Sequence, residues 1–169
     1  SFWNFLGAGV FGFTINLPIV NYYEHSTYLT ANHAHTALFG VYGMLSIALL
    51  LFTWRSLVQK EHWDDRLLKV SFFGLNVGLV LMFLVTLLPM GLAQVFASYA
   101  HGLWFARSNA FYDGKLVQVL GLVRAVPDGV IIAFGALPLL FFLLKTYPKL
   151  KKVGCKPGED IYQGKDCLL

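Results

Sequence analysis

Four long stretches without a charged residue constrain the fold of this chain more than any other feature. They cover residues 1–20, 26–54, 70–100 and 129–144. A helix needs about 20 consecutive apolar residues to cross the hydrocarbon core of a bilayer, and each stretch is close to that length or longer. Charged residues make up only 13% of the chain, whereas about 25% of the residues of a soluble domain are charged. The sequence therefore predicts an all-α membrane protein.

We expect one membrane-embedded helical segment over residues 1–146 and a polar tail over residues 147–169. About four spans are expected, forming part of a larger helical bundle, at residues 2–20, 30–54, 67–89 and 122–146. Residues 90–108 are expected either to extend the third span or to lie along the membrane interface. The two cysteines, Cys155 and Cys167, fall in the tail and are expected to be free thiols.

The distribution of Lys and Arg predicts the orientation in the membrane. Basic residues gather in the connection 55–69 and in the tail, whereas residues 20–32 contain none. Short loops rich in Lys and Arg stay on the cytoplasmic side, so we expect a cytoplasmic C-terminus. The connection 107–124, with three basic residues, is the exception to this pattern. Topology thus explains the net charge of +4, and no nucleic-acid partner is expected.

The tripeptide His33-Ala34-His35 lies inside the second uncharged stretch. A helix turns about 100° per residue, so the two imidazoles leave it about 200° apart and cannot share one metal ion. Ionisable side chains inside a span are functional candidates by default; the alternative is a pair of neutral histidines hydrogen-bonded to neighbouring helices. Zinc would need further convergent ligands, whereas haem iron needs one imidazole nitrogen on each face. The pair therefore favours two haem centres on opposite flanks of one helix.

Two glycine patterns have a simpler explanation than cofactor binding. Residues 7–12 read Gly-Ala-Gly-Val-Phe-Gly, which fits the dinucleotide fingerprint, but that motif needs a preceding strand and a βαβ unit. Small residues at such spacing let membrane helices approach closely. We expect this packing role here and at the Gly74 and Gly78 pair.

Three neighbouring segments resemble a known family: NLPIVNYYEH over residues 16–25, TYLTANHAH over 27–35 and LFGVYG over 38–43. They are similar to the catalytic subunit of bacterial nitric oxide reductases, in the haem–copper oxidase superfamily. The single-chain branch that oxidises quinol is the most similar. The likeness continues through Trp104, residues 106–108 and Pro127-Asp128 to the end of the last span.

The resemblance implies two b-type haems and a role for each histidine of the pair. His33 would be the proximal ligand of the high-spin haem at the active site. His35 would be one of two axial ligands of the low-spin haem that delivers electrons. His25 would lie near the haem propionates, the alternative being a solvated loop histidine, and Glu24 is a weaker candidate for the same region.

Asp128 resembles an acidic residue near the quinol site of the single-chain branch. A carboxylate there could accept a proton from the quinol hydroxyl as electrons leave. The alternative is a carboxylate favoured at a helix N-terminus by the helix dipole. Of the remaining histidines, His62 is expected to be solvated and His101 to have a structural role at the interface.

The family's active site also contains a non-haem iron, held by three histidines and a glutamate, and the low-spin haem has a second axial ligand. The chain has only five histidines, so these ligands are expected outside it. It therefore looks like about the C-terminal third of a larger protein and should be inactive alone. The expected partners are the rest of that polypeptide, membrane lipid, quinol and nitric oxide.

The resemblance implies reduction of two nitric oxide molecules to nitrous oxide. Two kinds of alternative remain open. Within the superfamily, these are a nitric oxide dismutase or a terminal oxidase. Outside enzymes, it is a membrane b-type cytochrome that only transfers electrons or senses redox state.

Overall fold

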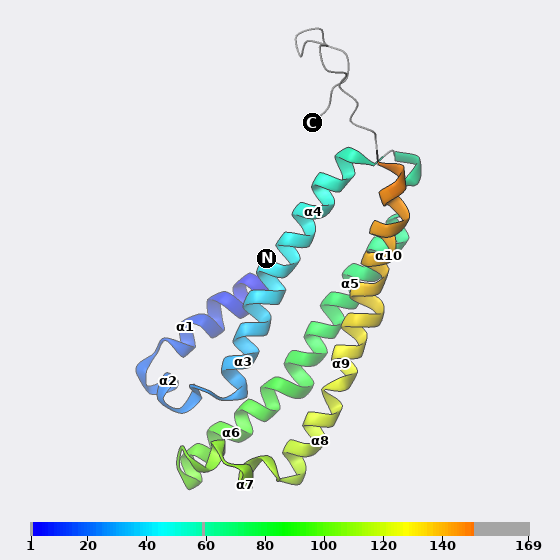
Figure 1. Cartoon of the computed structure of the whole chain (residues 1–169). Coiled ribbons are helices and arrows are strands. Elements are labelled where there is room, and N and C mark those ends of the chain that lie inside the picture. The colour runs from blue at the N-terminus through cyan, green and yellow to red at the C-terminus, as the bar shows by residue number, and fades with distance from the viewer. Residues whose placement is uncertain (1, 59, 151–169) are drawn as a thin grey trace, which may run out of the picture.

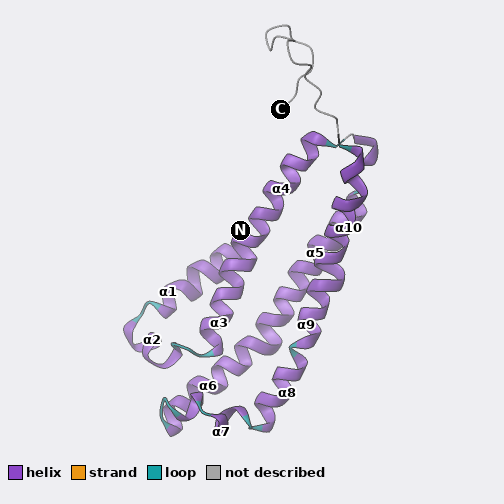
Figure 2. Cartoon of the chain, viewed as in Figure 1, coloured by secondary structure: helices purple, strands orange, loops and turns teal. Residues whose placement is uncertain are grey.

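The computed structural model describes residues 2–58 and 60–150, and these residues are helical apart from short connections (Figure 2). Within these residues, three helices are long and apolar enough to cross a membrane: Tyr28–Leu57, Asp65–His101 and Lys115–Lys149. The bent pair Asn4–Ile15 and Pro18–Glu24 would make a fourth. The expected all-α membrane architecture is therefore confirmed, with three to four candidate spans.

The first helical unit is broken in its middle, where one continuous span was expected over residues 2–20. It consists of η1 (Asn4–Phe11), α1 (Gly12–Ile15) and α2 (Pro18–Glu24), with a bend of 99° before α2. Leu17 is extended, with ψ of 125°, because the ring of Pro18 disfavours a helical residue before it. The side-chain amide of Asn21 donates to the carbonyl of Ile15 at 2.7 Å, which gives a partner to a carbonyl that the break leaves free.

The second unit carries the histidine pair and runs without a break over 30 residues. It is made of α3 (Tyr28–Ala34), η2 (His35–Gly43) and α4 (Met44–Leu57). Thr27 caps its start, since its hydroxyl accepts from the backbone N–H of Leu29 at 3.2 Å. This is the side-chain cap that threonine typically supplies.

The third unit extends well beyond the expected span at residues 67–89. After η3 (Lys60–His62), the segments α5 (Asp65–Leu81), η4 (Met82–Leu87) and α6 (Leu88–His101) form one helix of 37 residues. It ends at Gly102, whose φ of 91° is the left-handed conformation that glycine adopts readily. Residues 90–101 thus continue the helix, and the chain then turns through η5 (Phe105–Arg107) and α7 (Asn109–Tyr112).

The fourth unit begins at Lys115, earlier than the expected residue 122, and spans 35 residues. Its segments are α8 (Lys115–Val123), α9 (Ala125–Val130), η6 (Ile131–Ala136), α10 (Leu137–Thr146) and η7 (Tyr147–Lys149). It runs antiparallel to α5 and η4 of the third unit, whereas α6 diverges from it and packs against α3 (Figure 1). The first unit also lies beside α3 (Figure 1).

Glycines set how closely the third and fourth units approach. A Cβ atom on Gly74 would lie 2.3 Å from the backbone carbon of Phe134, and one on Gly78 would lie 2.4 Å from the side chain of Ile131. The hydroxyl of Ser71 donates to the carbonyl of Gly135 at 2.7 Å across the same contact. The expected packing role of Gly74 and Gly78 is therefore confirmed.

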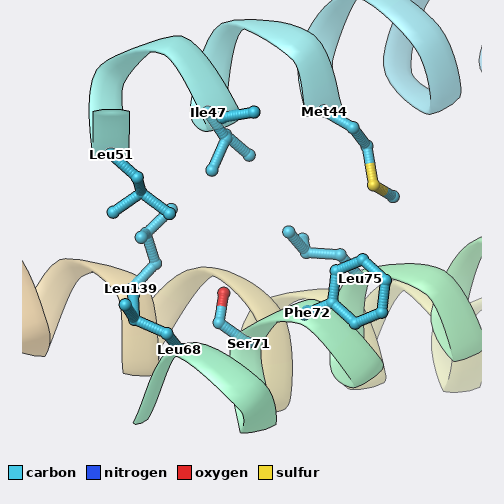
Figure 3. A pocket seen from close by; sticks show the side chains of 9 residues that line it. Met44, Ile47, Leu51, Leu68, Ser71, Phe72, Leu75 and Leu139 are labelled. Carbon is cyan, nitrogen blue, oxygen red and sulfur yellow. The ribbon is translucent and has the colours of Figure 1, made fainter. Parts of the chain in front are cut away.

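Apolar residues of α4 face the third and fourth units across a cavity. This cavity of about 160 Å³ lies between α4, α5 and α10 (Figure 3). Met44, Ile47 and Leu51 line it from α4, opposite Leu68 and Leu75 of α5 (Figure 3). The lining contains no titratable side chain, so this cavity is not a candidate for chemistry.

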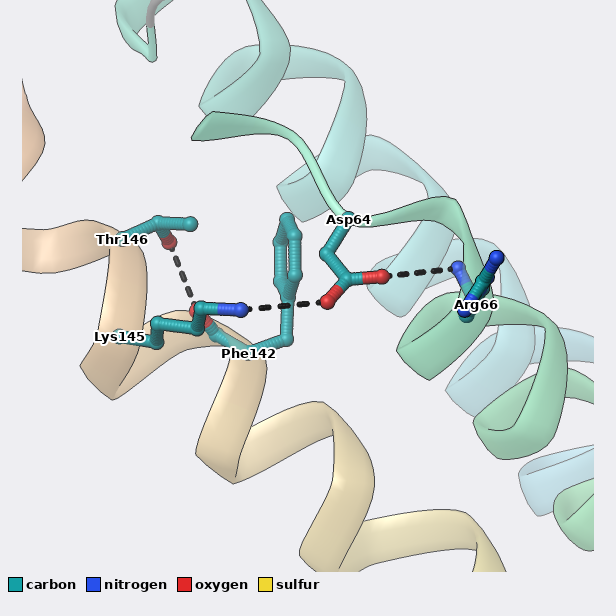
Figure 4. A network of polar contacts seen from close by, with 5 residues as sticks. All are labelled: Asp64, Arg66, Phe142, Lys145 and Thr146. Carbon is teal, nitrogen blue, oxygen red and sulfur yellow. Dashed lines mark hydrogen bonds and ion pairs between the residues drawn. The ribbon is translucent and has the colours of Figure 1, made fainter. Parts of the chain in front are cut away.

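Beyond that cavity, polar contacts close the end of the bundle that contains η3 and Asp64. Lys145 of α10 donates to Asp64 at 3.2 Å, and Asp64 also caps α5 by accepting from the N–H of Arg66 at 3.1 Å (Figure 4). The indole of Trp54 donates to the hydroxyl of Thr146 at 2.8 Å. These contacts tie the ends of the second, third and fourth units together.

Candidate functional site

His33 points from α3 toward the first helical unit. Its Nδ1 atom lies 2.7 Å from the backbone carbonyl of Gly7, and a Cβ atom on Gly12 would lie 3.2 Å from its Cε1 atom. A carbonyl only accepts hydrogen bonds, so Nδ1 carries the proton and donates it. The lone pair is therefore on Nε2, the nitrogen that is free to bind a metal.

Gly7 is positioned for this contact by the absence of a side chain. A Cβ atom there would lie 2.7 Å from the backbone carbon and the side chain of Thr36. The first unit and the helix of His33 therefore approach as closely as a glycine permits. The expected packing role of the glycines at residues 7–12 is confirmed at Gly7.

His35 lies on a different side of the same helix. Its Nδ1 atom lies 2.7 Å from the carbonyl of Ala31, so this ring also donates through Nδ1 and keeps the lone pair on Nε2. The ring lines an open cavity of about 390 Å³ between the second, third and fourth units. His33 thus contacts the first unit, whereas His35 lines a cavity between the second, third and fourth units.

Five of the six residues that line this second cavity belong to three π-helical segments, and Asp128 belongs to α9. The lining residues are His35, Phe39, Met82, Asp128, Ile131 and Ile132. His35 and Phe39 belong to η2, Met82 begins η4 and Ile131 begins η6. π-Helical turns within longer helices are frequent at functional sites, and three of the four in the described residues meet here.

Asp128 lines the same cavity as His35, although the two residues are far apart in the sequence. Its carboxylate lies 3.8 Å from the guanidinium of Arg124, one turn earlier. The helix that contains it begins at Lys115, so Asp128 lies inside a long helix and not at its start. This placement counts against the alternative that the dipole at a helix N-terminus accounts for the carboxylate.

His25 and Glu24 lie at the turn between α2 and α3. The side chain of His25 is exposed, and its backbone carbonyl accepts a hydrogen bond from the guanidinium of Arg107. Glu24 is 5% exposed, and its Oε1 atom has no hydrogen-bond partner among the described residues. The exposure of His25 is compatible with both of its sequence-based interpretations.

His62 and His101 lie outside this region. His62 is half-buried in η3, and its Nδ1 atom is buried, whereas a solvated histidine was expected. His101 is exposed at the end of α6, and its ring centroid lies 4.9 Å from that of Phe105. The two cysteines lie outside the described residues.

Sequence reasoning missed Gln94, a side chain with 0% exposure in the third unit. Its amide contacts the start of α3, the carbonyl of Ala106 and the hydroxyl of Tyr112. An amide inside an uncharged run was the available signal, because a polar group at membrane depth needs a partner. The presence of an amide in such a run does not predict which helices supply its hydrogen-bond partners.

The two imidazoles fit the haem ligation that the family resemblance implies. Within residues 2–58 and 60–150, no three His, Cys, Asp or Glu side chains converge to hold a metal ion, so each of these rings would have to bind a metal as a single protein donor. Haem iron takes one protein nitrogen on each face. A ligating histidine almost always donates its other N–H to a carbonyl or carboxylate, and both rings do so here.

Two comparisons with known proteins indicate the family of the chain. Residues 1–128 match the family model described as cytochrome C and quinol oxidase polypeptide I. Over 84 residues the chain is 37% identical to a nitric oxide reductase subunit of Stutzerimonas stutzeri. This alignment covers 49% of the chain but only 18% of that relative. Because the family model matches most of its length, the chain belongs to the cytochrome c and quinol oxidase polypeptide I family of haem–copper oxidases.

Proposed function

We propose that this chain is part of a membrane nitric oxide reductase that reduces two nitric oxide molecules to nitrous oxide with electrons from quinol. One observation carries the proposal. Two imidazoles leave one long apolar helix on different sides, His33 toward the first unit and His35 into a cavity, and the Nδ1 atom of each lies 2.7 Å from a backbone carbonyl. The similarity to part of a nitric oxide reductase supports the choice of reaction.

In this proposal His33 binds the iron of the active-site haem and His35 binds the iron of the haem that supplies its electrons. Haem iron supplies the redox chemistry when it is bound. The chain's own contribution is position, because residues two apart rise only about 3 Å along a helix. One rigid helix thus holds both ligands at nearly the same depth, which suits electron transfer from one centre to the other.

Asp128 would take part in quinol oxidation from the cavity that it shares with His35. When quinol gives up electrons it also loses its hydroxyl protons, and a carboxylate within hydrogen-bond reach can accept one. Its place beside His35 would put proton acceptance next to the proposed electron-accepting side. Arg124, at 3.8 Å, restrains the carboxylate on the helix surface.

The remaining parts of the proposed enzyme would come from polypeptide outside this chain. These are the second axial ligand of the low-spin haem and the ligands of a non-haem iron at the active site. His25 is proposed to lie near the haem propionates. The end of the bundle with η3, Asp64 and Lys145 is proposed to face the cytoplasm.

A terminal oxidase of the same family is the second candidate, because the matching family model is named for cytochrome c and quinol oxidases. The two functions differ in the metal that faces the active-site haem. Metal analysis of the purified full-length protein separates them, since non-haem iron would support the reductase and copper would support the oxidase.

The proposal predicts that each histidine holds a different haem. In the full-length protein, His33→Ala should remove the high-spin haem and abolish nitric oxide reduction, and His35→Ala should remove the low-spin haem signal. Optical and electron paramagnetic resonance spectra of the purified variants measure both. His62→Ala, at the far end of the bundle, should retain both haems. Loss of the same haem in both variants would show that the assignment is wrong.

A further inference from the structure

We propose that Gln94 is a positioning residue that holds the helix of His33 against the third unit and thereby maintains the hydrogen bond between His33 and Gly7. The proposal rests on the proposed function, because it concerns the same two ligands. It assigns a role to a residue whose side chain reaches neither imidazole directly.

Gln94 connects three separate segments through one buried amide. Its Oε1 atom accepts from the backbone N–H of Tyr28 at 2.7 Å. Its Nε2 atom donates to the carbonyl of Ala106 and to the hydroxyl of Tyr112, both at 3.0 Å. The side chain has 0% exposure, so water cannot replace these partners.

The contact with Tyr28 supplies a hydrogen-bond partner at the start of the helix that carries the two histidines. The first N–H groups of a helix have no partner within it, and Tyr28 is the first residue of α3. Thr27 supplies a cap for Leu29, and Gln94 supplies the partner for Tyr28. A Cβ atom on Gly91 would lie 2.5 Å from the backbone nitrogen of Leu29, so α3 and α6 are also in close contact here.

The helix of His33 is therefore held from two sides. Gln94 and Gly91 fix its start against α6, while Gly7 contacts Thr36 on the side of the first unit. If the contact with Gln94 is lost, the start of α3 is free to shift between these two neighbours. Such a shift would change distances between atoms of different helices, including the one between His33 Nδ1 and the carbonyl of Gly7.

The two histidines should respond differently to such a shift. The hydrogen bond of His33 joins two helices, since its acceptor Gly7 is 26 residues away in the sequence. The hydrogen bond of His35 stays within its own helix, since Ala31 is four residues earlier. A movement of α3 as a body changes the first bond and leaves the second intact. A general loss of stability, by contrast, would affect the hydrogen bonds of both histidines.

The experiment compares three variants of the full-length, haem-loaded protein. Gln94→Leu keeps the approximate size and removes every polar contact, whereas Tyr112→Phe removes one contact and keeps the one to Tyr28. Gln118→Leu is the matched control, because Gln118 is exposed on α8. The iron–histidine stretching band of the reduced high-spin haem reports on the hydrogen bond of His33. The paramagnetic resonance signal of the low-spin haem reports on His35.

We expect Gln94→Leu to shift and broaden the iron–histidine band while the low-spin signal stays at its wild-type position. Tyr112→Phe and Gln118→Leu should leave both signals unchanged. An unchanged band in Gln94→Leu, or equal changes in both signals, would overturn the proposal. If Gln94→Leu does not accumulate, Gln94→Met provides the test: it keeps the length of the side chain and removes the acceptor for Tyr28, and an unchanged band in it would contradict the proposal. Absence of both haem signals in the wild-type protein would refute the proposed function instead.

Discussion

At the scale of single residues, the two histidines differ in what their Nδ1 atoms contact. His33 donates to a carbonyl on another helix and His35 to a carbonyl one turn earlier on its own. The spacing of the pair predicted that the rings leave the helix on different sides, because helical geometry depends only on residue number. It could not predict the acceptors, since Gly7 reaches His33 only through the packing of two helices.

Asp128 gives a prediction at the same scale. In the full-length protein, Asp128→Asn should lower quinol-driven turnover at least about tenfold, because acid–base catalysis contributes about 10²–10⁴-fold where it operates. Turnover with a chemical reductant that supplies electrons directly to the haems should stay near the wild-type rate. Steady-state nitric oxide consumption with each donor measures the two rates.

The control for that experiment is Asp113→Asn, which changes an exposed carboxylate after α7 and should leave both rates unchanged. Equal quinol-driven rates in Asp128→Asn and the wild type would remove Asp128 from the quinol site.

At the scale of elements, the third and fourth helices are longer than the spans expected from the sequence. Charged residues such as Lys115 and Arg124 lie inside the fourth helical unit, and residues 90–101 extend the third. Hydropathy marks the part of a helix that suits the hydrocarbon core, but a helix continues as long as its backbone hydrogen bonds do. The bend before Pro18 is the converse case, because an uncharged run contains a break that the proline imposes.

The contact between the third and fourth units predicts the effect of one added methyl group. Gly74→Ala should lower the free energy of unfolding by about 1–3 kcal/mol, the usual effect of overpacking. The new Cβ atom would meet the backbone of Phe134 at 2.3 Å, and backbone cannot rotate away. Denaturant or thermal unfolding in detergent measures the change.

Gly121→Ala is the matched control, since a Cβ atom there has no atom within 4 Å. Alanine is favoured over glycine inside a helix by about 1 kcal/mol, so this variant should be as stable as the wild type or slightly more. A similar loss of stability in both variants would show that the contact at Gly74 is not as close as described.

At the scale of the whole molecule, the end of the bundle with η3 is closed by the ion pair between Asp64 and Lys145 (Figure 4). The hydrogen bond from Lys145 holds the pKa of Asp64 below its ordinary value of 3.8. A carboxyl group with a lowered pKa in the folded state stabilises the fold above its ordinary pKa. That contribution is lost as the pH falls through the lowered pKa.

We therefore expect the midpoint temperature of unfolding to fall at acidic pH, below about the ordinary pKa of an aspartate, with a smaller fall in Asp64→Asn. Asparagine keeps an oxygen that can cap α5, so this variant removes the charge and retains the cap. Asp113→Asn should follow the wild-type pH profile. Identical profiles for the wild type and Asp64→Asn would show that the ion pair does not contribute.

The sequence alone determined that the chain is helical and apolar enough to span a membrane, and that His33 and His35 point to different sides. Both follow from local rules, namely the length of uncharged runs and the angle per residue of a helix. Only the tertiary structure decided that His35 and Asp128 share a cavity, that Gly7 holds His33, and that Gln94 joins three segments. These contacts join residues far apart in the sequence, and no local pattern determines which helices meet or at what height.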